Sequence, residues 1–144
     1  MEKRYNIRVY AIILRGDEIL ITDEYRMGMP MTKFPGGGHE WGEGLRETVI
    51  RECEEELNQT PVYVEHFYTT DFFVASAFRE TDQLISIYYT VRLPDPGAVA
   101  VVQSVLDLPE FEGAQRFRWI KMKELHEDAV TFPIDKLVVK MLMK

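Results

Sequence analysis

The segment from Gly36 to Leu57 limits the fold of this chain more than any other. Three consecutive glycines follow Pro35 there, a pattern that disfavours a helix and favours a turn. From Glu43 onward, apolar residues recur every four positions up to Leu57, the spacing of a single buried helical stripe. Thr-Pro at positions 60–61 then ends the helix. The segment therefore predicts a glycine-rich turn followed by an amphipathic helix over residues 43–57.

The remaining elements are predicted from β-branched, aromatic and turn-forming residues. A hairpin is expected to turn at Gly16, and a short extended segment at 32–38. Residues 98–115 are expected to form a loop that holds at most a short strand. We expect strands over residues 7–14, 18–25, 62–75, 84–93 and 116–120, and a C-terminal helix over 134–143. This mixture predicts an α/β (α+β) fold, and 144 residues indicate one domain over 1–144.

Charge and composition exclude several classes of protein. The net charge is −7, which argues against a nucleic-acid polymer or an anionic membrane as partner. A single cysteine excludes an internal disulfide, and the N-terminal residues show no signal sequence. A cytoplasmic location is therefore expected. Residues 40–56 hold seven acidic and two basic residues, a net charge of −5, so the remaining 127 residues carry only −2.

Three acids of this window share one side of the predicted helix. Glu52, Glu55 and Glu56 fall within an arc of about 100° on a helical wheel, beside the apolar stripe. Carboxylates this close repel each other, and a hard divalent cation such as Mg²⁺, Mn²⁺ or Ca²⁺ relieves the repulsion. The simpler interpretation is a solvated helix face, because runs of charge usually are solvated. The adjacent glycines favour a site, since they let a backbone carbonyl approach a ligand.

These residues together resemble a known signature. Gly37, Glu43 and the run 51–56 (Arg-Glu-Cys-Glu-Glu-Glu) have the spacing of the Nudix box, GX5EX7REUXEEXGU, in which U is a bulky apolar residue. Every fixed position through the second Glu of the EE pair is matched. Two positions depart from the box, because Asn58 and Gln59 replace its final glycine and apolar residue. Asparagine tolerates the positive φ needed there, so only a small loss of stability is expected.

The resemblance implies both a fold and a chemistry. It implies a mixed β-sheet sandwiched between helices, with the box as a loop, helix and loop. It also implies hydrolysis of a nucleoside diphosphate linked to another moiety, dependent on Mg²⁺ with Mn²⁺ as substitute. The implied partner is a small phosphorylated nucleotide, and homodimers are expected by analogy. The alternative is a Nudix-fold module that binds a nucleotide as a sensor without cleaving it.

The resemblance also assigns roles to individual residues. The implied metal ligands are Glu52, Glu55, Glu56 and the carbonyl of Gly36, with Glu112 from a later loop as a further candidate. The implied catalytic residues are Glu52, Glu55 and Arg51, and the implied supports are Gly37 and Glu43. Glu52 is in some members the group that activates water, and the base is open between Glu52, Glu112 and another residue.

Two further expectations concern arginine and histidine. Arg51 is expected to pair with Glu47 or Glu55, four residues away on either side, and not with its neighbour Glu52. By the resemblance, it also reaches towards Glu43. The three histidines are scattered through the sequence and are expected to be ordinary surface or loop residues.

The strand before the box bears on the substrate. In relatives that hydrolyse oxidised nucleoside triphosphates, this strand often carries arginines near the phosphates. Here the stretch reads Ile-Thr-Asp-Glu-Tyr at 21–25, which weakens that interpretation. Arg26 and Lys33 are the two cations expected to do similar work.

Overall fold

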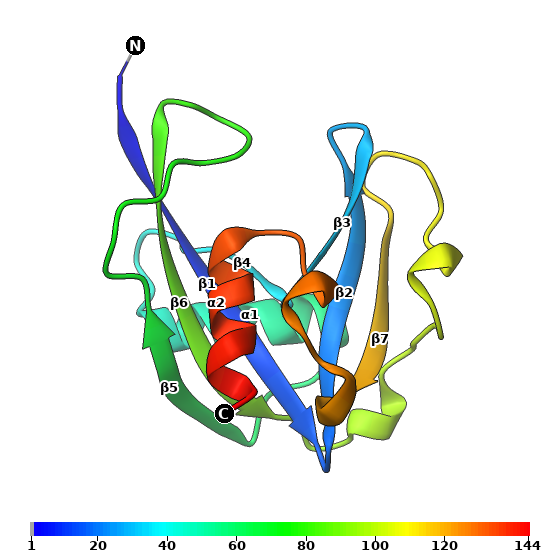
Figure 1. The fold of residues 1–144 in the computed structure, drawn as a ribbon. Helices are drawn as coiled ribbons and strands as arrows, with labels where there is room; N and C mark the ends of the chain where they lie inside the picture. Colours follow the sequence, from blue (N-terminus) through cyan, green and yellow to red (C-terminus); the bar gives the residue numbers. More distant parts are fainter. Residues whose placement is uncertain (1) are drawn as a thin grey trace. The chain divides into compact units, whose positions relative to one another are not determined.

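The computed structural model describes residues 2–144, and their contacts divide the chain into two units. The first unit comprises the residues up to Ala11 together with Gly36–Pro94. The second comprises Ile12–Pro35 and Asp95–Lys144. Strand β1 (Arg4–Arg15) is continuous and contributes residues to both units (Figure 1). Each unit is described below by itself.

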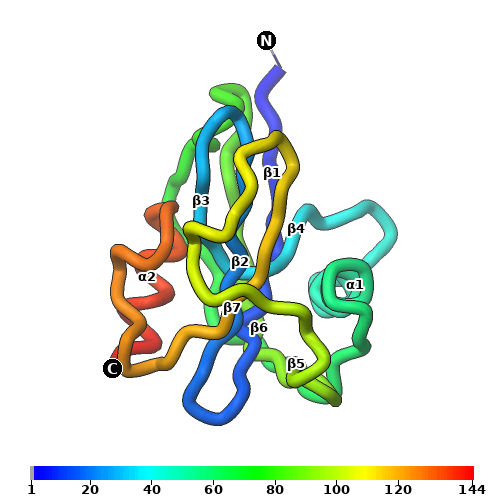
Figure 2. Tube along the Cα trace, turned by 90° about the vertical axis from the view of Figure 1, so that its right-hand side faces the viewer, coloured from blue at the N-terminus to red at the C-terminus, as the bar shows by residue number. Residues whose placement is uncertain are grey.

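The first unit holds one helix and four strands. Besides the N-terminal part of β1 these are β4 (Gly36–Gly38), α1 (Leu45–Leu57), β5 (Tyr63–Thr69) and β6 (Asp82–Arg92). β4 pairs antiparallel with β1, placing Gly37 opposite Val9, and β5 pairs antiparallel with β6. The helix α1 packs against β4 and β6 (Figure 2). The glycine turn and the helix that follows it are thus held by one sheet.

The helix α1 forms where the four-residue spacing predicts it. Val49, Cys53 and Leu57 are buried, and burial of apolar side chains of this size stabilises a fold by about 1.5–3 kcal/mol each. The Glu47 carboxylate accepts a hydrogen bond from the Gly44 backbone N–H at 2.9 Å, which satisfies a donor at the helix start. Asn58 ends the helix at φ 58° and ψ 33°, as expected for the residue that replaces the glycine.

The second unit consists of three further strands, four short 3₁₀ turns and one helix. The strands are β2 (Glu18–Arg26), β3 (Met29–Lys33) and β7 (Gln115–Lys121), the helix is α2 (Pro133–Leu142), and the 3₁₀ turns are η1 (Pro96–Ala98), η2 (Val105–Asp107), η3 (Met122–Glu124) and η4 (Glu127–Ala129). β2 pairs antiparallel with both β3 and β7 and, next to the Gly16 turn, with the end of β1.

One ion pair of the second unit has a fully buried carboxylate. Asp23 of β2 has no exposed surface, and Arg118 of β7 donates to both of its carboxylate oxygens, at 2.7 and 3.1 Å. The Thr32 hydroxyl donates a third hydrogen bond to Asp23 at 2.6 Å. This polar cluster links the three strands of the unit.

The described elements confirm the predicted α/β class and correct two of the expected segments. The strand expected over 62–75 ends at Thr69, and beyond it only Ala75 forms an isolated bridge, with Gln83. The extended segment expected at 32–38 is two strands, β3 and β4, separated at Pro35, whose missing N–H interrupts pairing. The segment 98–115 is mostly a loop, as expected, with the turn η2 and an isolated parallel bridge from Val101 to Phe117. Within residues 2–144, no helix is long and apolar enough to cross a membrane.

Candidate active site

The Gly37 backbone and the Glu52 carboxylate lie in close contact in the first unit. A Cβ added to Gly37 would lie 2.4 Å from one Glu52 oxygen and 2.9 Å from the other. At Gly36, whose φ is +150°, a Cβ would lie 2.1 Å from the Val9 carbonyl oxygen and 2.7 Å from the Tyr10 Cα. Glycine is therefore required at position 36, where a side chain would meet the backbone of β1, whereas a side chain at position 37 would displace the Glu52 carboxylate.

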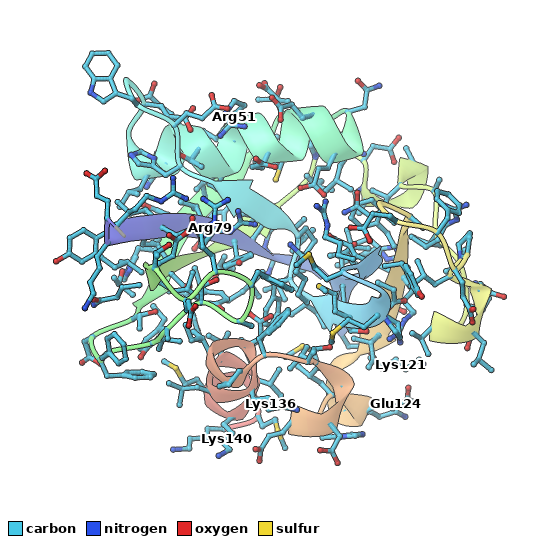
Figure 3. All side chains as sticks on the ribbon, turned by 90° about the horizontal axis from the view of Figure 1, so that it is seen from above. Arg51, Arg79, Lys121, Glu124, Lys136 and Lys140 are labelled. Atoms are coloured by element: carbon cyan, nitrogen blue, oxygen red, sulfur yellow. The ribbon has the colours of Figure 1, made fainter. Side chains whose placement is uncertain are left out.

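Arg51 lies at the centre of the acidic cluster on α1 (Figure 3). Its Nε and Nη2 donate to the two carboxylate oxygens of Glu43 at 3.0 and 2.8 Å. Its Nη1 donates to Glu52 at 3.0 Å and to Glu55 at 3.2 Å. A fifth hydrogen bond, from Nη2 to the Gly38 carbonyl at 2.9 Å, joins the helix to β4.

The expectation that Arg51 avoids Glu52 is therefore wrong, while its pairing with Glu55 is confirmed. Arg51 and Glu52 are adjacent on the helix, but the long arginine side chain turns back towards Glu43 and presents Nη1 to Glu52. Glu47, the other expected partner, instead accepts a hydrogen bond from the Gly44 backbone N–H at the helix start. Arg51 also lies 3.7 Å from Glu40.

These contacts shift the pKa values of both Glu43 and Arg51. The Arg51 guanidinium is the main cause that lowers the pKa of Glu43 to about 2, helped by hydrogen bonds from Thr48 and the Glu40 backbone. The same pairing raises the pKa of Arg51. Glu43 and Arg51 therefore both stay charged across the physiological pH range, and their pairing is constant.

The carboxylates differ in exposure. The Glu52 side chain is 14% exposed and that of Glu55 is 58% exposed, while Glu56 is half-buried. Glu54, Glu55 and Glu56 follow one another near the C-terminal end of α1, and its last turn has no basic residue. Negative charge at this end opposes the helix dipole, so the arrangement lowers helix stability without a cation.

Cys53 is a core residue, as its place on the apolar stripe predicts. Its side chain is buried, and this burial is the main cause that raises the pKa of its thiol to about 12. A protonated, enclosed thiol is neither a nucleophile nor a metal ligand at neutral pH.

The donor set of the cluster fits a hard divalent cation. Glu52, Glu55, Glu56 and the Gly36 carbonyl offer only oxygen, which Mg²⁺ and Mn²⁺ prefer. Among residues 2–144, no three acidic, histidine or cysteine side chains converge on one point that would hold a metal ion. Glu52 and Glu55 are instead both drawn to Arg51 Nη1.

Glu112 lies in the second unit. It is exposed, and its carboxylate accepts a hydrogen bond from the Met27 backbone N–H at 2.8 Å, at the tip of the hairpin formed by β2 and β3. The two cations expected to assist phosphate binding also lie in this unit. Arg26 and Lys33 both pair with Glu24, at 2.9 and 3.4 Å. Their charge is therefore offset locally.

The sequence matches the NUDIX domain family over residues 4–141. The chain belongs to the Nudix family. A search of curated proteins found no match.

Solved Nudix structures share the fold. A MutT structure from work on Aliivibrio salmonicida and Vibrio cholerae is 24% identical, with a TM-score of 0.68, over 96% of this chain and 97% of that one. MutT of Bacillus halodurans is 22% identical (TM-score 0.66; 96% and 83% covered). A MutT Nudix hydrolase of Burkholderia pseudomallei is 18% identical (TM-score 0.70; 94% and 96% covered). The predicted Nudix fold is confirmed.

Sequence reasoning missed two members of the Nudix box network. Thr48 is fully buried, and its hydroxyl lies 2.8 Å from the Glu43 carboxylate. His39, which was expected to be an ordinary surface or loop residue, lies with its Nδ1 2.7 Å from the Thr48 hydroxyl. The sequence alone gave little signal for Thr48, because it lies four residues before Glu52 and falls within the acidic arc of the helical wheel.

Proposed function

We propose that this Nudix hydrolase cleaves the diphosphate bond of a nucleoside diphosphate linked to another moiety, and that it requires Mg²⁺, with Mn²⁺ as substitute. The contact of the Glu52 carboxylate with the Gly37 backbone, beside Arg51, is the observation that carries the proposal. Glu52, Glu55, Glu56 and the Gly36 carbonyl would hold the metal. Glu112 remains a proposed additional ligand.

The residues of the first unit have separable tasks in this reaction. Glu52 is placed by Gly37 and Arg51, so its less exposed carboxylate is the one best fixed to bind the metal or to accept a proton from the attacking water. Glu55 is more exposed, and its contact with Arg51 Nη1 would be exchanged for the metal when substrate arrives. A bound divalent cation offsets charge on the phosphoryl oxygens and lowers the pKa of water. Arg51 offsets the charge of Glu52 and Glu55 before binding, because its Nη1 donates to both carboxylates.

The partners follow from the same chemistry. We propose a small phosphorylated nucleotide as substrate, because a loaded metal turns the most acidic stretch of the chain into a phosphate-binding site. A nucleic-acid polymer or a membrane is not expected as a partner. A homodimer is proposed by analogy. Residues 1–144 are proposed to work as a single Nudix domain in the cytoplasm.

Activity on a substrate panel tests the proposal. The purified protein with Mg²⁺ is incubated with ADP-ribose, dinucleoside polyphosphates, nucleotide sugars and nucleoside triphosphates, and products are separated by ion-exchange chromatography. At least one substrate should yield a nucleoside monophosphate or another phosphorylated product, and chelation should stop the reaction. Saturable binding of a nucleotide without turnover would instead indicate a sensor module.

Variants of α1 test the site. Glu55→Gln or Glu56→Gln should lower kcat by orders of magnitude with little change in thermal stability. Glu54→Gln is the matched control, because Glu54 lies on the same helix but accepts a hydrogen bond from the Thr60 hydroxyl and is not a proposed ligand. Wild-type activity in both Glu55→Gln and Glu56→Gln would refute the assignment.

A further inference from the structure

His39 and Thr48 form a pair behind the Glu43–Arg51 ion pair, at positions that the Nudix motif leaves variable. His39 Nδ1 lies 2.7 Å from the Thr48 Oγ1. Thr48 is fully buried on α1, and His39 is half-buried at the end of β4, where its backbone N–H donates to the Ile7 carbonyl at 2.9 Å. Both residues are therefore fixed by the elements that carry them, and their contact does not involve a mobile surface side chain.

The hydrogen on this contact can be assigned by counting donors. The Thr48 Oγ1 lies 2.8 Å from the Glu43 Oε1 and 3.1 Å from the Gly44 carbonyl oxygen, and a hydroxyl has only one hydrogen to donate. Glu43 is ionised beside Arg51, and a carboxylate accepts hydrogen bonds without donating any. The Thr48 hydrogen must therefore point towards these oxygens, and the hydrogen shared with His39 must come from Nδ1.

The opposite tautomer would leave an uncompensated contact. If Nδ1 were the unprotonated nitrogen of His39, the Thr48 hydroxyl would donate to it. The Thr48 and Glu43 oxygens would then face each other at 2.8 Å without a hydrogen between them. Thr48 is buried, so water has no room to relieve that repulsion. The bonding partner of one ring nitrogen thus fixes the tautomer of the ring.

The pair acts on the site through Glu43. The Glu43 Oε1 accepts hydrogen bonds from Thr48, from Arg51 Nη2 and from the Glu40 backbone N–H at 3.1 Å. With its carboxylate orientation fixed in this way, Glu43 holds the guanidinium so that Nη1 reaches Glu52. The hydrogen bonds run in one direction, from His39 through Thr48 to Glu43, where they meet the donors of Arg51.

We propose that His39, as its Nδ1–H tautomer, is a positioning residue of this Nudix site: it directs the Thr48 hydroxyl onto Glu43 and so fixes the Arg51 guanidinium that orients Glu52. The effect on catalysis rests on the proposed function, whereas the tautomer of His39 does not. Partners of this kind, behind the ligands of a site, typically change metal affinity or activity by about 10–100-fold.

The tautomer is tested directly by nitrogen NMR. Long-range ¹H–¹⁵N correlation spectra of the labelled protein at about pH 8, well above the reference histidine pKa of about 6.5, distinguish a protonated Nδ1 from a protonated Nε2. One histidine should carry its hydrogen on Nδ1, and its signals should disappear in His39→Asn. Thr48→Val should shift His39 towards the other tautomer, because the acceptor is lost. A protonated Nε2 on His39 in the wild-type protein would overturn the proposal.

Kinetics test the positioning role with whichever substrate the panel identifies. Thr48→Val keeps the shape of the side chain and removes the hydroxyl, and it should lower kcat by about tenfold with KM little changed. Thr48→Ser should recover most of that loss, and His39→Asn, which restores an N–H near Nδ1, should be more active than His39→Leu. Thr60→Val is the matched control, since the Thr60 hydroxyl also donates to a glutamate of α1, Glu54, outside the site.

Coupling separates positioning from a general loss of stability. Thermal unfolding is measured for every variant, and His39→Leu carries the test if Thr48→Val does not fold. In the double variant with His39→Leu and Thr48→Val, the loss of kcat should be no greater than in the worse single variant. Both substitutions interrupt the same series of hydrogen bonds from His39 through Thr48 to Glu43. Wild-type kcat in Thr48→Val or in His39→Leu, or fully additive losses, would overturn the role. If the wild-type enzyme turns over no substrate, the proposed function fails and the NMR measurement still decides the hydrogen bond.

Discussion

Arg51 binds both carboxylate oxygens of Glu43, with Nε to Oε2 at 3.0 Å and Nη2 to Oε1 at 2.8 Å. The two residues lie eight positions apart, one before α1 and the other within it. A guanidinium matches a carboxylate in this two-point geometry, which fixes direction as well as distance. The pair therefore anchors the loop before the helix to the helix itself, and the remaining donor, Nη1, is left for Glu52.

The Glu43–Arg51 ion pair should stabilise the protein at neutral pH and lose this effect in acid. The pKa of Glu43 falls from an ordinary value of 4.5 to about 2 in the folded protein. A carboxyl with a lowered pKa contributes stability that is complete above about pH 4.5 and is lost as the pH falls towards 2. Glu43→Gln should therefore be less stable than wild type at pH 7, by an amount that shrinks below pH 4.5. Urea unfolding midpoints across this range measure it, and a pH-independent difference would contradict the prediction.

Substitutions in the glycine run should separate site geometry from fold. Gly37→Ala places a methyl group against the Glu52 carboxylate, the end of a flexible side chain, so the chain should fold while the carboxylate is displaced. We expect a loss of activity of about 10²-fold, typical of a small displacement of a reacting group. Gly38→Ala is the control, because the nearest atom to its Cβ is Arg8 Nη1 at 3.5 Å. Equal activity of the two variants would exclude the contact as a determinant.

The residue after α1 should control stability without controlling chemistry. Asn58 adopts φ 58°, and its N–H bonds to the Glu54 carbonyl at 3.1 Å. Asn58→Gly should unfold at the same or a slightly higher denaturant concentration, while Asn58→Ala should lose about 1 kcal/mol because alanine disfavours a left-handed conformation. Hydrolysis rates should match wild type in both. A stable Asn58→Ala variant would show that the helix end rearranges.

The ion pair between Asp23 and Arg118 in the second unit should show strong coupling. Arg118→Met leaves the Asp23 carboxylate buried with only the Thr32 hydroxyl, and such unpaired charges typically cost about 3–5 kcal/mol. Asp23→Asn combined with Arg118→Met should recover part of that loss, since no buried charge remains. Chemical denaturation of the two single variants and the double variant measures the coupling energy. Additive losses would mean that the two side chains contribute independently.

Most residues of the candidate site could be predicted from the sequence, because they lie close together along the chain. Gly37, Glu43 and the acids of α1 lie within 20 residues, and a helix places residues three and four apart on one side. The ligand candidates on the helix and the buried stripe follow from that periodicity alone. The ends of strands were harder to predict from the sequence. The residues after Thr69 still have the composition of a strand, but the pairing of β5 ends at Thr69.

Sequence alone determined the Nudix family, the helix with its acidic side, and the need for glycine before it. The tertiary structure decided which atoms meet. It paired Arg51 with Glu52, which helix spacing did not predict. The long Arg51 side chain bends back to bind Glu43, and this places its Nη1 next to Glu52. The tertiary structure also brought His39 of the β4 end to Thr48 of α1. Spacing along one helix predicts neighbours within that helix, whereas contacts between elements depend on how the sheet and the helix pack.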